Sequence, residues 1–257
     1  MDGKIADLFH FPVKGLSGQP LKMVSLRQGE GFPCDRVFGL ARADSGFDPD
    51  APRPLPKNRF LMLMKDEQLA GLNTYLDPET LRLTVRADGK LLLDCDISTE
   101  AGAENTAAFF SGMFGFGDGE RPFLAHAAPH RFTDVSVVSQ ELMNAVSLIN
   151  LASVTELESR IGRQVDPMRF RGNIYFDGWP AFSELDLVDQ EIEIGKARLK
   201  ILKRTRRCPA TEVNPATAER DIAVPQLLQD HYGHADMGIY AVVVSPGEIR
   251  PGDILNV

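Results

Sequence analysis

The stretch Glu191–Lys203, Glu-Ile-Glu-Ile-Gly-Lys-Ala-Arg-Leu-Lys-Ile-Leu-Lys, carries the pattern that governs most of this chain. Apolar residues stand at alternate positions on both sides of a central Gly-Lys step. Because successive side chains of a strand point to opposite faces, this alternation predicts two strands, Glu191–Ile194 and Ala197–Lys203.

Short segments of the same kind recur on both sides of this stretch. An Asp-Gly step at Asp88-Gly89 separates two of them and predicts a hairpin, since glycine tolerates the positive φ of a tight turn. The other predicted strands are Lys4–Phe11, Leu21–Arg27, Asp35–Arg42, Phe60–Met64, Leu81–Val85, Lys90–Asp94, Asn173–Phe176, Ile239–Val244 and Asp253–Val257.

Helical patterns are few. Ser153-Val154-Thr155-Glu156 matches a capping box and predicts a helix that begins there and ends at Gly162. Ala103–Phe110 and Pro225–Asp230 are two further short candidates, the latter opened by a proline. Many short strands with few helices predict a mostly β fold of the β-barrel type, and exclude a doubly wound α/β sheet.

Glycines at 112–119 suggest a boundary between two halves, residues 1–118 and 119–257. Ser45–Asn58 is rich in proline, aspartate and glycine and predicts a surface loop. Its position after the Arg36 segment makes it a candidate lid over a site.

The composition narrows the class of protein. The chain has 257 residues, 43% of them hydrophobic, and a net charge of −8, which disfavours a nucleic-acid binder. No signal peptide and no apolar run of membrane-spanning length is present. Free cysteines without an export signal predict a cytoplasmic protein with no membrane partner.

Three widely spaced cysteines, without a CxxC motif, argue against a disulfide scaffold or an iron–sulfur site. Cys208 differs from the other two, because it ends the basic run Lys203-Arg204-Thr205-Arg206-Arg207. Neighbouring cations favour a thiolate, and arginines bind phosphate through paired N–H groups. The competing interpretation is a solvated strand with a packed cysteine. Cys34 and Cys95 are predicted to be packing residues.

Two further groups of residues are candidate sites. Met168–Asn173 contains Arg169 and Arg171, two apart, which on a strand would point to one face. Together with Lys14 and Arg36 they offer enough positive charge for one anionic ligand, although surface charges explain them equally well. His231 and His234 are three apart, but the glycine between them favours a loop over a metal site.

Five segments, taken in order, resemble the MOSC proteins, the family named after the C-terminal domain of molybdenum cofactor sulfurases. The amidoxime-reducing components belong to it. The resemblance covers nearly the whole chain, as an N-terminal β-barrel region followed by a MOSC domain. The segments are Pro12–Gly15, Asp35–Leu40, Pro167–Ile174, Arg206–Val213 and His231–Tyr240 with Gly247–Asp253.

The resemblance implies a molybdenum–pterin cofactor held between the two regions. Cys208 matches the residue that ligates molybdenum in the reductases and would be both catalytic residue and metal ligand; a thiolate is a soft ligand suited to that metal. The matching cofactor-binding positions are Lys14, Arg36, Arg171, Asn173, Arg206, Arg207 and Thr211.

The implied activity is two-electron reduction of an N-hydroxylated or N-oxide small molecule. The chain ends at Val257 without a ferredoxin domain and shows no membrane anchor, so we expect a separate electron-donor protein. A second function stays open, in which the protein is a non-catalytic carrier of the cofactor or of a persulfide sulfur on Cys208. A third is a cofactor-free scaffold.

Overall fold

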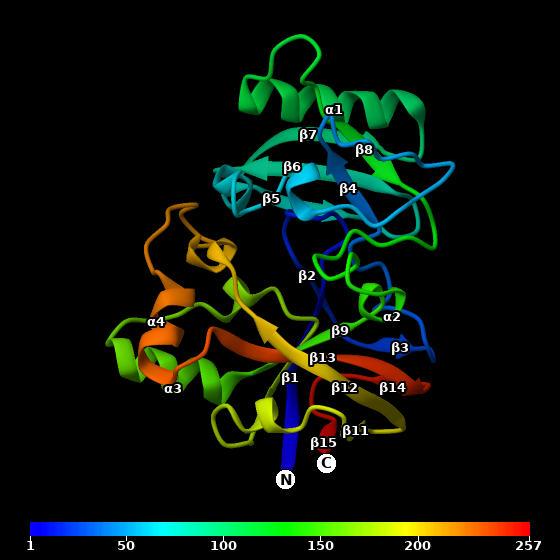
Figure 1. The fold of residues 1–257 in the computed structure, drawn as a ribbon. Helices are drawn as coiled ribbons and strands as arrows, with labels where there is room; N and C mark the ends of the chain where they lie inside the picture. Colours follow the sequence, from blue (N-terminus) through cyan, green and yellow to red (C-terminus); the bar gives the residue numbers. More distant parts are fainter.

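A computed structural model describes residues 1–257 as two stacked halves, with both termini at the base of the larger one (Figure 1). The larger half is a β-barrel. Its strands follow the order β10-β9-β13-β12-β11-β15-β1, and β10 pairs with β1 to close the ring, while β2 extends it beside β1. The fold class predicted from the sequence is therefore confirmed. The strands are β1 (Asp2–His10), β2 (Gln19–Leu21), β9 (Val146–Asn150), β10 (Ile174–Asp177), β11 (Glu191–Ile194), β12 (Ala197–Arg206), β13 (Asp236–Ser245) and β15 (Ile254–Asn256).

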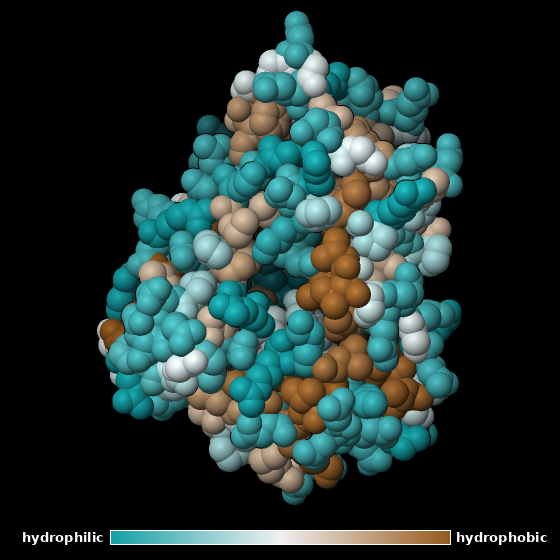
Figure 2. Space-filling model, in the orientation of Figure 1, coloured by the Kyte–Doolittle hydropathy of each residue, from teal (hydrophilic) through white to brown (hydrophobic).

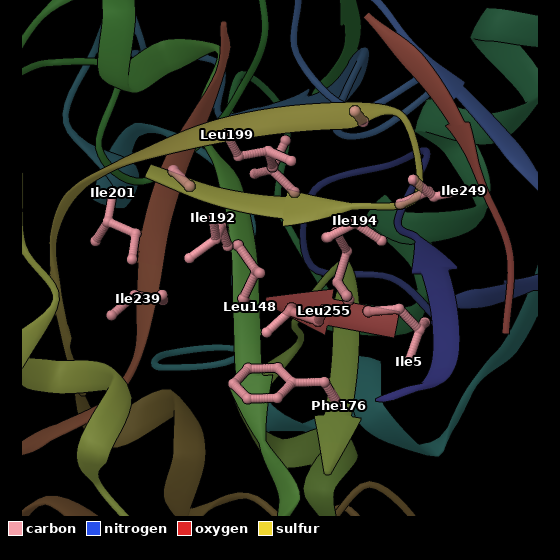
Figure 3. Packing of buried hydrophobic residues seen from close by; sticks show 14 of the residues in the cluster. Ile5, Leu148, Phe176, Ile192, Ile194, Leu199, Ile201, Ile239, Ile249 and Leu255 are labelled. Carbon is pink, nitrogen blue, oxygen red and sulfur yellow. The ribbon is translucent and has the colours of Figure 1, made fainter. Parts of the chain in front are cut away.

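The barrel interior is a core of 22 buried hydrophobic residues. Alternate side chains of β11 and β12, among them Ile192, Ile194 and Leu199, point into it, beside Leu255 of the neighbouring β15 and with Phe176 of β10 in the same cluster (Figure 3). All the neighbouring strands are antiparallel except β9 and β10, which are parallel. The apolar residues that alternate along Glu191–Lys203 therefore form the inward face of the barrel wall.

The smaller half has a core of its own, with 13 buried hydrophobic residues. Helix α1 lies across one face of its three-stranded sheet (Figure 1). The Asp88-Gly89 hairpin is confirmed, since β6 and β7 pair antiparallel around it. The strands are β5 (Asn73–Leu76), β6 (Arg82–Ala87) and β7 (Lys90–Asp96), with the pair β4 (Phe38–Ala41) and β8 (Phe123–His126). In the barrel half, β3 (Val24–Leu26) pairs with β14 (Gly247–Ile249), and Val24 and Leu26 belong to the barrel core.

Four α-helices are present: α1 (Glu100–Phe114), α2 (Gln140–Met143), α3 (Leu151–Ile161) and α4 (Val224–Tyr232). Helix α4 confirms the short helix predicted at Pro225–Asp230, which a proline opens. Helix α1 is longer than predicted, because Thr99 caps its start and the helix continues through Gly112 to a left-handed Gly115. None of the helices is long and apolar enough to cross a bilayer.

The predicted capping box at Ser153 is wrong. Helix α3 begins earlier, because the Asn150 side chain accepts a hydrogen bond of 3.1 Å from the Ala152 amide. Ser153 lies inside the helix, fully buried, and its hydroxyl donates to the Glu184 carboxylate at 3.0 Å. A buried hydroxyl with a carboxylate partner takes the tertiary contact in place of the cap.

Three predicted strands also change. Leu21–Arg27 contributes to two different sheets, as the end of β2 and the whole of β3. Phe60–Met64 is no strand: Phe60 makes only an isolated bridge to Ala41. The strand predicted to start at Asp35 starts at Phe38, because Arg36 has a φ of 50°, which no strand accommodates.

Candidate functional site

A cavity of about 320 Å³ opens where the two halves meet. Figure 2 shows a hollow near the middle of this face, with hydrophilic surface on one side and a column of hydrophobic surface on the other. The lining is strongly basic, although the chain as a whole is acidic. Nine cationic side chains contribute: Lys14, Arg36, Lys57, Arg169, Arg171, Lys203, Arg204, Arg206 and Arg207. Asp134 is the one carboxylate in the lining.

All eight residues named from the sequence line this one cavity. They come from four segments far apart in the chain, and only the fold brings them together. They are Lys14, Arg36, Arg171, Asn173, Arg206, Arg207, Cys208 and Thr211. Their individual roles stay predictions.

Cys208 stands at the end of β12, directly before a turn of 3-10 helix over Pro209–Glu212. The hydroxyl and the amide of Thr211 donate to the Cys208 carbonyl at 2.9 and 3.0 Å, which fixes the turn. The Cys208 side chain is half-buried and carries a free thiol. The closest polar contact of its Sγ is the Lys57 Nζ, at 3.1 Å.

Lys57 reaches the thiol from the other half of the molecule, at the end of the Ser45–Asn58 loop. The loop itself is held in place, since Phe47 is buried and packs edge-on against Phe60 and Phe132. The loop therefore delivers a cation to Cys208 from the smaller half. Whether it also acts as a lid stays a prediction.

Asp134 joins two of the cations. Its carboxylate forms an ion pair with the Lys14 ammonium and a second contact of 3.3 Å with Lys57 Nζ. Lys14 also donates to the Phe132 carbonyl at 3.0 Å. Although burial by itself would raise the pKa of Asp134, Lys14 and Lys57 lower it below its usual range. Burial lowers the pKa of Lys14 in spite of Asp134, and for Lys57 the carboxylate and thiol outweigh burial and raise the pKa.

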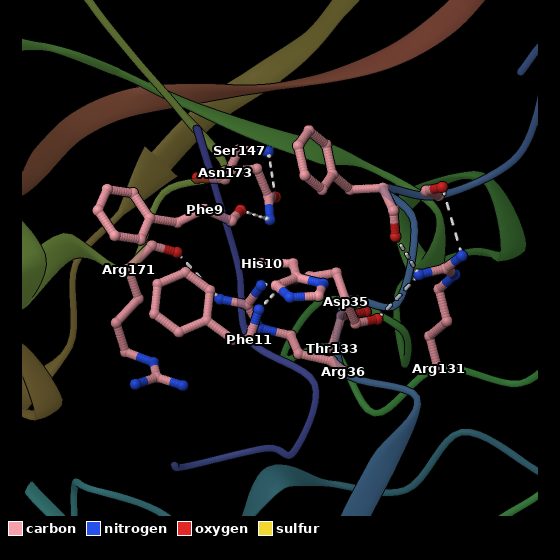
Figure 4. Close-up of polar contacts among 12 residues, drawn as sticks. Phe9, His10, Phe11, Asp35, Arg36, Arg131, Thr133, Ser147, Arg171 and Asn173 are labelled. Carbon is pink, nitrogen blue, oxygen red and sulfur yellow. Dashed lines mark hydrogen bonds and ion pairs between the residues drawn. The ribbon is translucent and has the colours of Figure 1, made fainter. Parts of the chain in front are cut away.

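Phe11 lies between two guanidinium groups (Figure 4). The Arg36 and Arg171 guanidinium carbons lie 4.9 and 4.2 Å from the centre of its ring. Arg36 also pairs with Asp35 and donates to the Arg171 carbonyl at 3.0 Å. Both arginines have positive φ, 50° and 49°. Such backbone costs about 1–3 kcal/mol per residue, and these contacts hold it in place.

The Arg171 guanidinium has no protein partner. Its side chain makes no hydrogen bond or ion pair, and Nη2 is buried and unsatisfied. Burial and the adjacent Arg36 lower its pKa to about 9. A buried cation without a counter-charge is unfavourable unless a ligand supplies one. Arg171 is therefore the best candidate in the cavity for binding an anion.

Asn173 and Arg207 line the cavity, but their side chains are occupied by the fold. The Asn173 amide accepts from the Ser147 amide at 3.1 Å and donates to the Phe9 carbonyl at 3.2 Å (Figure 4). Arg207 donates to the Met237 carbonyl through Nε at 2.8 Å and to the Phe170 carbonyl at 3.0 Å. Both residues shape the cavity wall, and Arg206 is an exposed cation at its edge.

The expectation that Arg169 and Arg171 share a strand face is wrong. Pro167–Phe170 forms a 3-10 turn and Arg171 is left-handed, so the two side chains diverge. Arg169 is buried, forms an ion pair of 2.6 Å with Asp221 and donates to the Glu212 carbonyl at 3.0 Å. It thereby secures the turn that follows Cys208.

The sequence alone did not point to Lys57, Asp134 or Phe11 as site residues. Lys57 lies in a loop whose composition indicates only mobility or function, and Asp134 belongs to no motif. Phe11 reads as one more strand residue. Lys57 and Asp134 line the cavity, and Phe11 packs against two of its lining residues, Arg36 and Arg171. Each is placed by contacts between residues more than twenty positions apart, such as the Phe11 amide to the Asp35 carboxylate at 2.8 Å.

The remaining candidates lie apart from the cavity. No group of three or more His, Cys, Asp or Glu side chains could hold a metal ion. His231 is in the last turn of α4, and His234 follows the left-handed Gly233. Cys95 is a core residue of the smaller half, and Cys34 is half-buried with its pKa raised by burial.

The similarity to known proteins extends over nearly the whole chain. The MOSC N-terminal beta barrel domain matches residues 2–119 and the MOSC domain residues 126–256. Mitochondrial amidoxime-reducing component 1 of Homo sapiens is 27% identical, over 98% of this chain and 82% of that protein. The Mus musculus protein is 30% identical, over 98% and 81%. The solved YUAD protein from Bacillus subtilis is similar with a TM-score of 0.44 and 13% identity, covering 99% of this chain and 94% of that one. The chain therefore belongs to the MOSC family.

Proposed function

We propose that this protein binds a molybdenum–pterin cofactor in the basic cavity and reduces N-hydroxylated or N-oxide small molecules. Electrons would come from a separate redox protein. Its relatives from Homo sapiens and Mus musculus are named for amidoxime reduction, and an amidoxime is an N-hydroxylated compound. The observation that carries the proposal is that one cavity holds a half-buried free thiol and an unpaired guanidinium with a buried, unsatisfied nitrogen.

The residues present fit this cofactor. Cys208 offers a single thiolate, the kind of soft ligand that molybdenum accepts, and Arg171 lacks the anion that a pterin phosphate would supply. Lys14 and Arg36 add charge beside it, although each already has a carboxylate partner. When bound, the cofactor would supply two-electron oxygen-atom transfer.

The protein's own groups would hold and orient the reactants. Thr211 fixes the turn that presents Cys208, and the Phe11–Arg36–Arg171 stack fixes the anion-binding end of the cavity. In the overall reaction the substrate N–O bond breaks, two electrons and two protons are consumed, and the oxygen leaves as water. The side chains that carry protons in this scheme all line the cavity between the halves; they are Lys14, Arg36, Arg171, Cys208 and Thr211.

Metal and pterin analysis after expression in a host that makes the cofactor tests the proposal. We expect about one molybdenum and one pterin per chain in the wild type, and loss of N-hydroxy reduction in Cys208→Ser. Cys34→Ser is the matched control, because Cys34 lies outside the cavity, and it should keep both metal and activity. Equal molybdenum and equal activity in Cys208→Ser would overturn the assignment.

A carrier function is the second candidate, and the 3.1 Å contact between Lys57 and Cys208 favours it as well, since a cation also stabilises a persulfide anion. Intact mass separates the two functions. A persulfide adds about 32 Da to Cys208, and reductant removes it. Cofactor without turnover, or a reducible sulfur adduct without cofactor, would indicate a carrier.

A further inference from the structure

We infer that the substrate of this site is an organic anion, an N-hydroxylated compound with a carboxylate-type charge and an apolar body, and that Lys57 selects it. The inference rests on the proposed function for the reaction. The charge preference itself follows from the cavity and can be measured without turnover.

The charges of the lining do not balance. Four carboxylates form ion pairs with cations of the lining, namely Asp134, Asp35, Asp221 and Asp186. Subtracting their four negative charges from the nine positive ones leaves a net charge of five positive units. A bound phosphate monoester contributes about two negative charges and a Cys208 thiolate one. A positive surplus remains, and it attracts an anionic substrate and repels a cationic one.

Lys57 is the cation best placed to act on the substrate. Its Nζ lies 3.1 Å from the Cys208 Sγ, so a molecule that approaches the sulfur also approaches the ammonium group. Asp134 does not neutralise it fully, because the same carboxylate pairs with Lys14. Lys203 adds a second lining cation, which is exposed and has no ion pair.

The other side of the mouth is apolar. Val135 lines the cavity, and the nearby Val137 and Val138 are 49% and 61% exposed. Figure 2 shows hydrophobic surface beside the hollow, where Figure 1 places the segment leading into α2. Cations on one side and valines on the other suit a molecule with a charged end and an apolar body.

Alkylation of the cofactor-free protein measures the preference directly. Iodoacetate is anionic and iodoacetamide is neutral, and the same thiolate attacks both and displaces iodide from each. The ratio of the two rates at Cys208 is therefore independent of the fraction of the thiol that is ionised. We expect this ratio to exceed that of glutathione by about tenfold, and Lys57→Met to lower it by about five- to tenfold. Peptide mass spectrometry separates Cys208 from the other two cysteines.

Matched variants locate the effect. Lys203→Met should lower the ratio by about twofold to threefold, since its exposed ammonium is better screened. Lys196→Met makes the same change of net charge at an exposed residue outside the cavity and should leave the ratio unchanged. A wild-type ratio equal to that of glutathione, or an equal drop in Lys196→Met, would overturn the inference.

Turnover by the holoenzyme separates failure of the inference from failure of the function. Three para-substituted N-hydroxybenzamidines serve as probes, carrying a carboxylate, a carboxamide or an aminomethyl group. We expect kcat/KM to fall in that order, with the carboxylate favoured about tenfold over the carboxamide, and less at high salt. Equal reduction of all three overturns the inference and leaves the function intact. Reduction of none, with charge-selective alkylation, overturns the function and supports the anion preference.

Discussion

Replacing Arg171 with methionine should stabilise the protein in a phosphate-free buffer and abolish its stabilisation by phosphate. The Arg171 side chain is half-buried and packs on Phe11, its Nη2 atom is fully buried, and its guanidinium makes no hydrogen bond or ion pair with the protein. Methionine is a similarly long, flexible side chain without charge, so it fills much of the same space. The substitution therefore removes the charge with little change in packing.

The size of the effect follows from the pKa of about 9. Compared with a usual value of about 12.5, this corresponds to about 5 kcal/mol, at about 1.4 kcal/mol per pKa unit. Since the pKa of Arg171 is lower in the folded state, its charged form destabilises the folded protein. This destabilisation is present in full below pH 9 and declines only as the pH rises above it. The lost stacking on Phe11 offsets about 0.5–2 kcal/mol. We expect a net gain of about 3–4 kcal/mol at pH 7.

Urea unfolding in chloride buffer, with and without inorganic phosphate, is the assay. The wild type should gain about 2.7 kcal/mol when phosphate reaches a hundred times its Kd, and Arg171→Met should gain nothing. Arg198→Met, at an exposed ion pair on β12, is the control and should change stability by less than about 0.5 kcal/mol in either buffer. A less stable Arg171→Met protein in chloride, or equal stabilisation of both by phosphate, would refute the reasoning.

Two further predictions concern pH and the junction of the halves. Burial lowers the pKa of His130, so the unfolded chain binds more protons, and stability should fall as the pH drops below about 6.5. His130→Phe should make the fall in melting temperature between pH 7 and pH 5 smaller, whereas His231→Phe, at an exposed residue, should leave it unchanged. An equal fall in the two variants would contradict this prediction. Arg220 donates to the Met64 carbonyl at 2.8 Å and to the Pro209 carbonyl at 3.0 Å, which ties the smaller half to the turn after Cys208. Arg220→Met should cost about 1 kcal/mol and speed amide hydrogen exchange at both segments, and unchanged exchange would argue against the tie.

Local patterns predicted the parts of the fold that depend on neighbouring residues. Alternation identified β11 and β12, and the Asp88-Gly89 step identified a hairpin, because both depend on conformations that a few consecutive residues fix. Where local and tertiary preferences compete, the pattern failed. Ser153 has the sequence signature of a cap, yet it is buried beside Glu184, thirty-one positions away.

The sequence also grouped the candidate site residues, through the resemblance of five ordered segments to one family. It could not place Lys57 beside Cys208, because a contact over 151 positions depends on how the two halves stack. Nor could it show that Asn173 and Arg207 are occupied by backbone groups while Arg171 is free. Free and occupied donors look alike in a sequence.

The sequence by itself determined the mostly β class, the family resemblance, the basic run that ends at Cys208 and the set of cations near it. These follow from periodicity, from motif order and from charges that are local to a segment. Only the tertiary structure decided that nine cations face one cavity with one carboxylate, and that one of these cations, Arg171, has a buried nitrogen without a partner. The physical reason is that net charge is a sum over the chain, whereas Coulomb interaction and desolvation depend on distance and burial, which the folding of both halves sets.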